Sequence, residues 1–182
     1  MPLPVSEVER ELTHTRQVRY EGYKRADGLW DIEAHLTDVK NHDYQLKTGV
    51  RRAGQPVHEM WLRITIDHTF TILEAMAVSD VVPYPGGCEA IAPAYRKLIG
   101  LNLVRGFRKR AHELLGSVRG CTHLTEMLSG LPTAAIQTFA GEMKEERDDG
   151  GKPFQLDQCH ALETSTETVR KWYPKWYKGN AG

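Results

Sequence analysis

The fold is set by one strictly alternating stretch, Leu29-Trp30-Asp31-Ile32-Glu33-Ala34-His35-Leu36-Thr37-Asp38-Val39. Apolar side chains occupy every second position, at Trp30, Ile32, Ala34 and Leu36. Successive side chains of a β-strand point to opposite faces, so the pattern predicts a strand with one buried face. The intervening polar residues are Asp31, Glu33, His35 and Thr37. We expect this polar row to be a solvated sheet face rather than a carboxylate–imidazole site.

Three more segments around this stretch predict strands. Residues 15–24 precede it and are joined to it by the turn signal Ala26-Asp27-Gly28. Residues 57–66 also alternate, with an apolar row made of Met60, Leu62, Ile64 and Ile66. A short turn leads from there to a strand over 70–82, while residues 40–56 carry turn and charge signals and predict a loop. The four strands therefore predict two hairpins in one antiparallel sheet.

The second half of the chain predicts helices. Apolar residues recur at helical spacing over residues 88–99, 104–115, 121–129 and 133–146. Thr133, after Pro132, is the expected N-cap of the last of these helices. Strands followed by helices indicate an α+β fold, in which an antiparallel sheet of about four strands carries the helices on one face.

We expect the whole chain, residues 1–182, to form a single domain. Hydrophobic residues make up 40% of it, which is enough for a core without disulfides or other cross-links. The expected parts are an N-terminal extension over 1–14, the sheet over 15–82, a helical half over 83–146 and a C-terminal tail segment over 153–182.

Charge and hydropathy argue against several classes of partner. Lys+Arg and Asp+Glu both number 24, so the net charge is zero and nothing favours nucleic acid or an anionic membrane as the main partner. The N-terminal residues are polar and acidic, and no apolar run approaches the length of a membrane span. We therefore expect a cytoplasmic protein whose thiols stay reduced.

Two cysteines stand behind glycine at predicted helix starts. Cys88 follows a pair of glycines where the sheet gives way to a helix, and Cys121 follows Gly120. A thiol at a helix N-terminus has a lowered pKa because free N–H groups and the helix dipole favour the thiolate. The pair indicates two functional thiols or, as the alternative, two small buried side chains beside glycine turns.

Three further side chains can complete a site with these thiols. His123 lies two residues beyond Cys121, Cys159 lies in the tail, and His58 begins the core-facing row of its strand. Thiolate and imidazole bind borderline metals and iron–sulfur clusters. The sequence therefore predicts a metal site drawn from Cys88, Cys121, His123, Cys159 and His58. The alternatives are a capping or surface His123, a partly buried His58 and three buried thiols.

Five runs of sequence together carry a family resemblance. They are Asp27-Gly28-Leu29-Trp30-Asp31-Ile32-Glu33-Ala34-His35-Leu36-Thr37-Asp38, His58-Glu59-Met60-Trp61-Leu62-Arg63-Ile64-Thr65-Ile66-Asp67, Pro83-Tyr84-Pro85-Gly86-Gly87-Cys88, Gly120-Cys121-Thr122-His123-Leu124-Thr125-Glu126 and Leu156-Asp157-Gln158-Cys159-His160-Ala161-Leu162. These runs resemble a bacterial family catalogued as domain of unknown function 2889, over nearly the whole chain. The resemblance implies no particular activity.

A second resemblance concerns layout. Gly87-Cys88-Glu89-Ala90-Ile91 and Cys121-Thr122-His123-Leu124 each place a cysteine at a predicted helix start after a sheet. In this respect residues from about 57 to 140 are similar to the U-type iron–sulfur cluster scaffold proteins. The first scaffold cysteine has no counterpart here, His58 being the nearest candidate, and Gly120 replaces the histidine that precedes the last scaffold cysteine. The resemblance implies that Cys88 and Cys121 lie side by side at the sheet end, near His58.

These observations support several hypotheses of function. The leading one is a cytoplasmic metal- or iron–sulfur-binding protein, with zinc or an iron–sulfur cluster as cofactor, that serves as an accessory, maturation or redox factor for a client oxidoreductase. The second is a thiol-dependent enzyme of acyl or sulfur transfer, with Cys88 or Cys121 as nucleophile and a nearby histidine as base. The others are a non-catalytic interaction domain with structural cysteines and a zinc hydrolase with Glu126 or Asp157 as general base.

Overall fold

The computed structural model describes residues 3–140 and 151–179. The chain divides into two compact units, Met1–Thr138 and Phe139–Gly182, and each is described by itself. The expectation of a single domain stays a prediction. None of the described helices combines the length and the apolar composition needed to cross a membrane.

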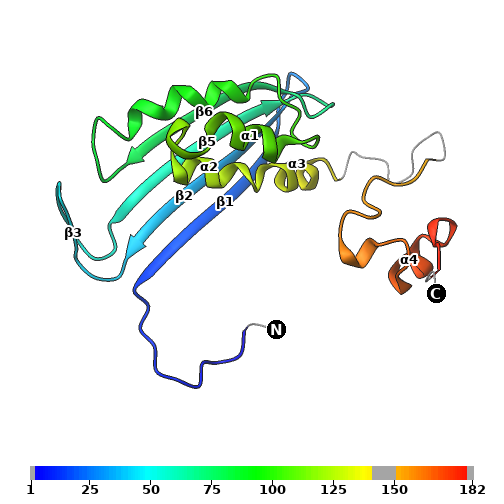
Figure 1. Ribbon diagram of the computed structural model, residues 1–182, viewed down its shortest axis with the longest axis horizontal. Helices are drawn as coiled ribbons and strands as arrows, with labels where there is room; N and C mark the ends of the chain where they lie inside the picture. Colours follow the sequence, from blue (N-terminus) through cyan, green and yellow to red (C-terminus); the bar gives the residue numbers. More distant parts are fainter. Residues whose placement is uncertain (1–2, 141–150, 180–182) are drawn as a thin grey trace. The chain divides into compact units, whose positions relative to one another are not determined.

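The first unit is built on a four-stranded antiparallel sheet of order β1-β2-β5-β6 (Figure 1). The strands are β1 His14–Lys24, β2 Trp30–Lys40, β5 Pro56–Ile66 and β6 Ile72–Val81. β1 and β2 form one hairpin and β5 and β6 another, so that β2 and β5 meet in the centre. The α+β class and the two predicted hairpins are confirmed.

One part of the predicted loop is wrong. Within residues 40–56 the chain forms a small separate hairpin of β3 Tyr44–Leu46 and β4 Gly49–Arg51. Each strand has three residues, which is too short for an alternating pattern to stand out from the surrounding charges. Gly49, with φ of 134°, opens the second strand in a backbone conformation that side chains rarely adopt.

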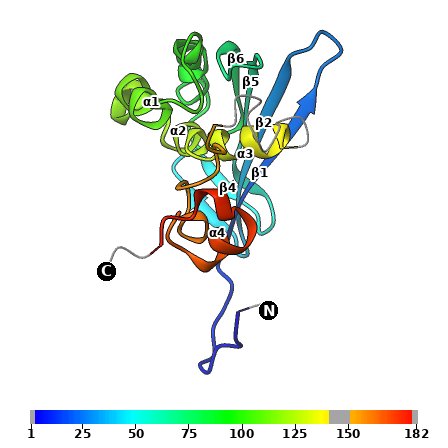
Figure 2. The same ribbon diagram turned by 90° about the vertical axis from the view of Figure 1, so that its right-hand side faces the viewer.

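The core lies between one face of the sheet and a layer of helices. The two predicted apolar rows are buried, namely Trp30, Ile32, Ala34 and Leu36 in β2 and Met60, Leu62, Ile64 and Ile66 in β5. Figures 1 and 2 show α1 Phe107–Leu115, α2 Thr122–Leu128 and α3 Leu131–Phe139 gathered on one side of the sheet. α2 packs over the two central strands, and its Leu124 and Met127 are fully buried.

Two helices differ in detail from what the sequence predicts. The segment over 88–99 is a 3-10 helix, η1 Glu89–Leu98, with Pro93 inside it. Proline lacks the N–H that an α-helix interior needs, which favours the tighter, irregular form. α3 begins at Leu131, so Thr133 lies inside it and the predicted N-cap is wrong. The predicted end of this helix, at 146, lies outside the described residues.

β1 and α3 approach each other closely at Gly22. A Cβ added to Gly22 would lie 1.8 Å from Oγ1 of Thr138, so only glycine fits without a shift of the helix residue. The remaining 3-10 helix of this unit, η2 Ser117–Arg119, connects α1 to the segment before α2. The start of α2 lies over the end of the sheet where β1 and β5 begin and β2 ends, since Nε2 of His123 in α2 lies 3.7 Å from Oδ2 of Asp38 in β2.

The second unit contains short elements only. They are η3 His160–Leu162, α4 Glu167–Trp172 and η4 Pro174–Trp176. Asp157 holds the two ends of the η3 segment together, because its Oδ1 accepts a hydrogen bond of 2.8 Å from the backbone N–H of Thr164, which follows η3. Thr166 is the N-cap of α4 and accepts a hydrogen bond from the N–H of Val169.

Candidate metal centre

Asp38 is a buried carboxylate at the end of the core-facing row of β2. It follows Trp30, Ile32, Ala34 and Leu36 at the same two-residue spacing, and it is 4% exposed. In the ladders of the sheet it stands opposite Arg16 of β1 and His58 of β5. The strand register therefore places a cation and an imidazole on the two sides of one buried carboxylate.

Three residues donate hydrogen bonds to Asp38. Its Oδ1 accepts from Nε2 of His14 at 2.8 Å and from Nε of Arg16 at 2.8 Å. Its Oδ2 accepts from Nη2 of Arg16 at 2.8 Å and from Nδ1 of His58 at 3.1 Å. Burial acts to raise the pKa of Asp38, but the hydrogen bonds from Arg16 and His14 and the nearby positive charges outweigh it and lower the pKa to about 2.

His123 joins this group from α2. Its Nε2 lies 3.7 Å from Oδ2 of Asp38, and its ring centroid lies 3.9 Å from that of His58 at an angle of 32°. Burial, followed by the neighbouring charge of His123, lowers the pKa of His58, and Asp38 opposes this effect. We call His14, Arg16, Asp38, His58 and His123 the Asp38 cluster.

Three side chains of the Asp38 cluster are close enough to share one ion. Asp38, His58 and His123 can each offer a ligand atom, and these atoms all lie within 4.8 Å of one another. Within residues 3–140 and 151–179, these three are the His, Cys, Asp or Glu side chains whose ligand atoms come this close together as a group. One carboxylate and two imidazoles form a donor set that proteins use for zinc and for non-haem iron.

Cys121 lies on the other edge of the His123 ring. Its Sγ lies 3.9 Å from Nδ1 of His123, whereas Asp38 faces Nε2 of the same ring. The Sγ atom of Cys121 also lies 4.0 Å from Sδ of Met60. Burial acts to raise the pKa of the Cys121 thiol, but the hydrogen bond with His123 and backbone N–H groups at the start of α2 bring the pKa below its usual range. Cys121 is the N-cap residue of α2, so it lies at a helix start, as the sequence predicts.

Tyr95 of η1 holds the start of α2 in place. Its buried hydroxyl donates to the carbonyl oxygen of Cys121 at 3.0 Å and accepts from the N–H of the same residue at 3.1 Å. It also lies 2.7 Å from Oγ1 of Thr125, which in turn donates to the carbonyl oxygen of Leu115 in α1. These bonds fix both Cys121 and the first turn of α2, on which His123 stands.

Arg16 connects the sheet to α2 as well. While its Nε and Nη2 bind Asp38, its Nη1 donates to Oε2 of Glu126 at 2.6 Å. The Asp38 side chain is 6% exposed and the Glu126 side chain 51%, so the guanidinium lies between a buried carboxylate and a solvated one.

The structure brings together three of the five predicted site residues, His58, Cys121 and His123. Cys88 is half-buried at the start of η1, where its N–H donates to the carbonyl oxygen of Tyr84 at 3.1 Å, and it is not part of the group of three. Cys159 is exposed and belongs to the second unit. That Cys88 and Cys159 serve as ligands stays a prediction.

Asp38 and Arg16 are site residues that are not among the five predicted from the sequence. The signal for Asp38 was present, because position 38 has the parity of the buried row and a carboxylate on a core face needs partners. Arg16 has no comparable signal, since an arginine near the start of a strand is commonly solvated. Its role depends on the pairing of β1 with β2.

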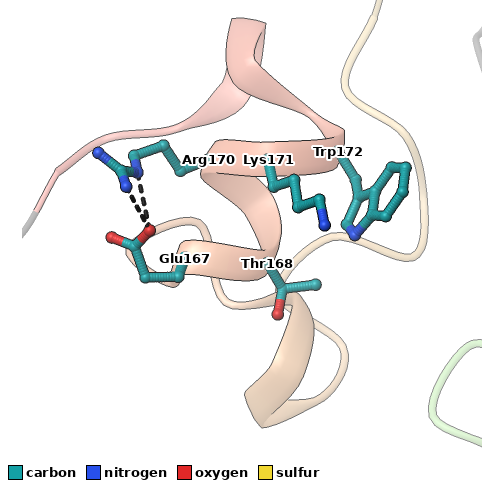
Figure 3. Close-up of a pocket in the computed structure, with 5 residues that line it drawn as sticks. All are labelled: Glu167, Thr168, Arg170, Lys171 and Trp172. Atoms are coloured by element: carbon teal, nitrogen blue, oxygen red, sulfur yellow. Dashed lines mark hydrogen bonds and ion pairs between the residues drawn. The ribbon is translucent and has the colours of Figure 1, made fainter.

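A separate hollow of about 590 Å3 lies along α4 in the second unit (Figure 3). It is lined by Glu167, Thr168, Arg170, Lys171 and Trp172. Figure 3 shows Arg170 turned toward Glu167, with which it forms an ion pair of 2.7 Å, and Lys171 beside the ring of Trp172. Its lining residues include one carboxylate and no imidazole or thiol, so this hollow offers no donor set for a transition metal.

Fold and site together define an α+β domain with a buried carboxylate–imidazole cluster at one end of its sheet. A family model matches residues 14–137, and the chain belongs to that family, described as Protein of unknown function (DUF2889). The matched range contains the entire Asp38 cluster. No curated protein and no solved structure matches the chain, so the resemblance to the U-type scaffolds gains no support.

Proposed function

We propose that this protein binds a single divalent transition metal through Asp38, His58 and His123. The observation that carries the proposal is the convergence of three ligand atoms from β2, β5 and α2 within 4.8 Å of one another. Two of the separations, 3.1 and 3.7 Å from Oδ2 of Asp38, are those expected between ligands that sit about 2 Å from a common ion.

The donor set favours zinc or ferrous iron over an iron–sulfur cluster. Clusters are held by cysteine thiolates, and of the two cysteines in the first unit Cys121 is the one that lies against this group. Two imidazoles and one carboxylate leave coordination positions open for water or substrate, as in catalytic zinc sites and in non-haem iron enzymes. The metal would supply Lewis-acid or redox chemistry there, and Asp38 and the two histidines would hold it.

The surroundings of the three ligands support this role. His14 donates a hydrogen bond to Oδ1 of Asp38 and orients its carboxylate, as outer residues do in metal centres. The three cysteines are free, and free thiols suit the reducing cytoplasm that we propose for this protein. Within that setting an accessory or redox role toward a client oxidoreductase remains part of the proposal.

Metal analysis of the protein, purified without air from cells supplied with zinc and iron, tests the proposal. We expect close to one equivalent of metal in the wild type and its loss in Asp38→Asn, His58→Gln and His123→Gln. His35→Gln is the matched control, because His35 lies on the opposite face of β2, where its Nε2 pairs with Glu59 at 3.0 Å. A metal-free wild type, or metal content unchanged in the three variants, would overturn the proposal.

A second candidate is thiol chemistry at Cys121. The observation that favours it is that His123 stands between Cys121 and Asp38, with one ring nitrogen toward each. This order of thiol, imidazole and carboxylate is the one that thiol enzymes use to activate a nucleophile, although the 3.7 Å between Nε2 of His123 and Oδ2 of Asp38 is longer than a hydrogen bond. Loss of thiol reactivity in His123→Gln, in protein shown to be metal-free, would distinguish this function from metal binding.

A further inference from the structure

Arg16 occupies the same carboxylate that the proposed metal requires. Its Nη2 lies 2.8 Å from Oδ2 of Asp38, and this oxygen is also the one nearest His58 and His123. We infer that Arg16 is an internal cation that competes with the metal for Asp38, and that Glu126 receives its guanidinium when the metal binds. This inference rests on the proposed metal function and adds its regulation.

The competition follows from charge and burial. A guanidinium and a divalent ion on one carboxylate repel each other, and the repulsion is weakly screened where the carboxylate is buried. Arg16 cannot relieve it by losing a proton, because guanidinium stays protonated in proteins. Metal binding at Oδ2 of Asp38 therefore favours a position of Arg16 farther from that oxygen.

Glu126 offers that position without loss of a charged partner. Nη1 of Arg16 already donates to Oε2 of Glu126 at 2.6 Å, so a change of side-chain torsions can exchange one carboxylate for the other. The Glu126 side chain is 51% exposed, and the guanidinium would gain water as it leaves Asp38. Because Glu126 is on α2 and Asp38 on β2, the exchange would connect the occupancy of the metal site to the contact between β1 and α2.

An ordinary supporting role for Arg16 predicts the opposite result. Residues that orient a metal ligand raise affinity, and removing one typically weakens metal binding about 10- to 100-fold. Removing a competing cation strengthens binding instead. The sign of the change in affinity therefore separates the two roles.

The experiment is a titration with Zn2+ in competition with a chromophoric chelator. We expect Arg16→Gln to bind Zn2+ at least about tenfold more tightly than the wild type, because the competing charge is gone. Arg19→Gln is the matched control, since Arg19 lies on the same strand with the same charge, pairs with Glu21 at 3.3 Å and is solvated. Arg16→Lys keeps the charge without the two-pronged contact and should lie between wild type and Arg16→Gln, which gives a second variant if Arg16→Gln folds poorly.

Glu126→Gln tests the receiving carboxylate. With Glu126 neutral, Arg16 has no alternative anion. We therefore expect Glu126→Gln to lower Zn2+ affinity about threefold or more when it is made in the wild type. The same change made in Arg16→Gln should leave Zn2+ affinity unchanged. The Nε–H resonance of Arg16 should shift on addition of Zn2+ as its bond to Asp38 breaks. Weaker or equal binding in Arg16→Gln would overturn the inference and leave the metal site standing, whereas absence of binding in both proteins would overturn both.

Discussion

Nδ1 of His58 lies 3.1 Å from Oδ2 of Asp38, and the two residues stand directly opposite each other in the β2–β5 ladder. Both side chains have the parity of the buried rows, so the register of the sheet forces an imidazole and a carboxylate to meet at the edge of the core. A shift of one residue in this pairing would turn the apolar rows to solvent, so burial of the core also keeps the pair together.

Asp38→Asn should destabilise the metal-free protein strongly. The carboxylate is buried and accepts hydrogen bonds from three residues, and its neutralisation leaves the charge of Arg16 without its inner partner. We expect the free energy of unfolding at pH 7 to fall by about 3 kcal/mol, as measured by urea denaturation. Asp80→Asn, at an exposed position of β6, should change it by less than about 0.5 kcal/mol. Equal effects of the two variants would show that Asp38 is not held as described.

The contribution of Asp38 to the free energy of unfolding should decrease as pH falls. Its pKa is about 2 in the folded protein, below the ordinary value of 3.8, so the unfolded chain takes up the proton first as pH falls. The stability difference between wild type and Asp38→Asn should shrink as pH drops from about 5 toward 2. Urea denaturation of both metal-free proteins across this range measures it. A difference that is unchanged at pH 2.5 would contradict the low pKa.

Cys121 should react as a partly activated thiol. In a Cys88→Ser/Cys159→Ser background, we expect the pH midpoint of its alkylation to lie below 9.0, the ordinary value, because His123 and backbone N–H groups of α2 favour the thiolate. His123→Gln should raise this midpoint and slow alkylation at pH 7 roughly threefold to tenfold. His68→Gln, in the turn before β6, serves as control. Rates that do not respond to His123→Gln would exclude a role for His123 in activating Cys121.

Tyr95→Phe should loosen the start of α2. The variant removes a hydroxyl that serves both backbone groups of Cys121 and the side chain of Thr125, and it leaves these groups without that partner inside the protein. We expect a loss of about 1–3 kcal/mol in the free energy of unfolding, because unsatisfied buried polar groups are costly. Tyr84→Phe, whose hydroxyl belongs to an exposed residue, should be nearly neutral. Faster hydrogen exchange of the amides of Cys121 and Thr125 would locate the effect.

Much of the sheet could be predicted because its signal is local. The rows headed by Trp30 in β2 and Met60 in β5 alternate over enough residues to exclude a helix, and both are buried as predicted. The β3–β4 hairpin could not be predicted in the same way, because three residues per strand make no period. The 3-10 form of η1 depends on Pro93 and on packing against β6, of which only the proline is visible in the sequence.

The sequence predicts which kinds of residue form the candidate site, but it does not predict the full set of residues. The residue types of His58, His123 and Cys121 and their positions near element ends predict that they belong to a site. Asp38 has the parity of a core residue, but its function depends on partners that other elements supply. Arg16 and Glu126, which are 110 positions apart, touch only because α2 packs over the sheet beside β1.

By itself the sequence determined the class of fold, the two hairpins and the buried face of each central strand, because alternation and turn chemistry act between neighbouring residues. Only the tertiary structure decided that His58 and His123 meet at Asp38, that Arg16 already occupies this carboxylate, and that Cys121 faces the opposite edge of the His123 ring. These relationships depend on strand register and on the packing of α2, and both are set by burial of the whole core rather than by any local pattern.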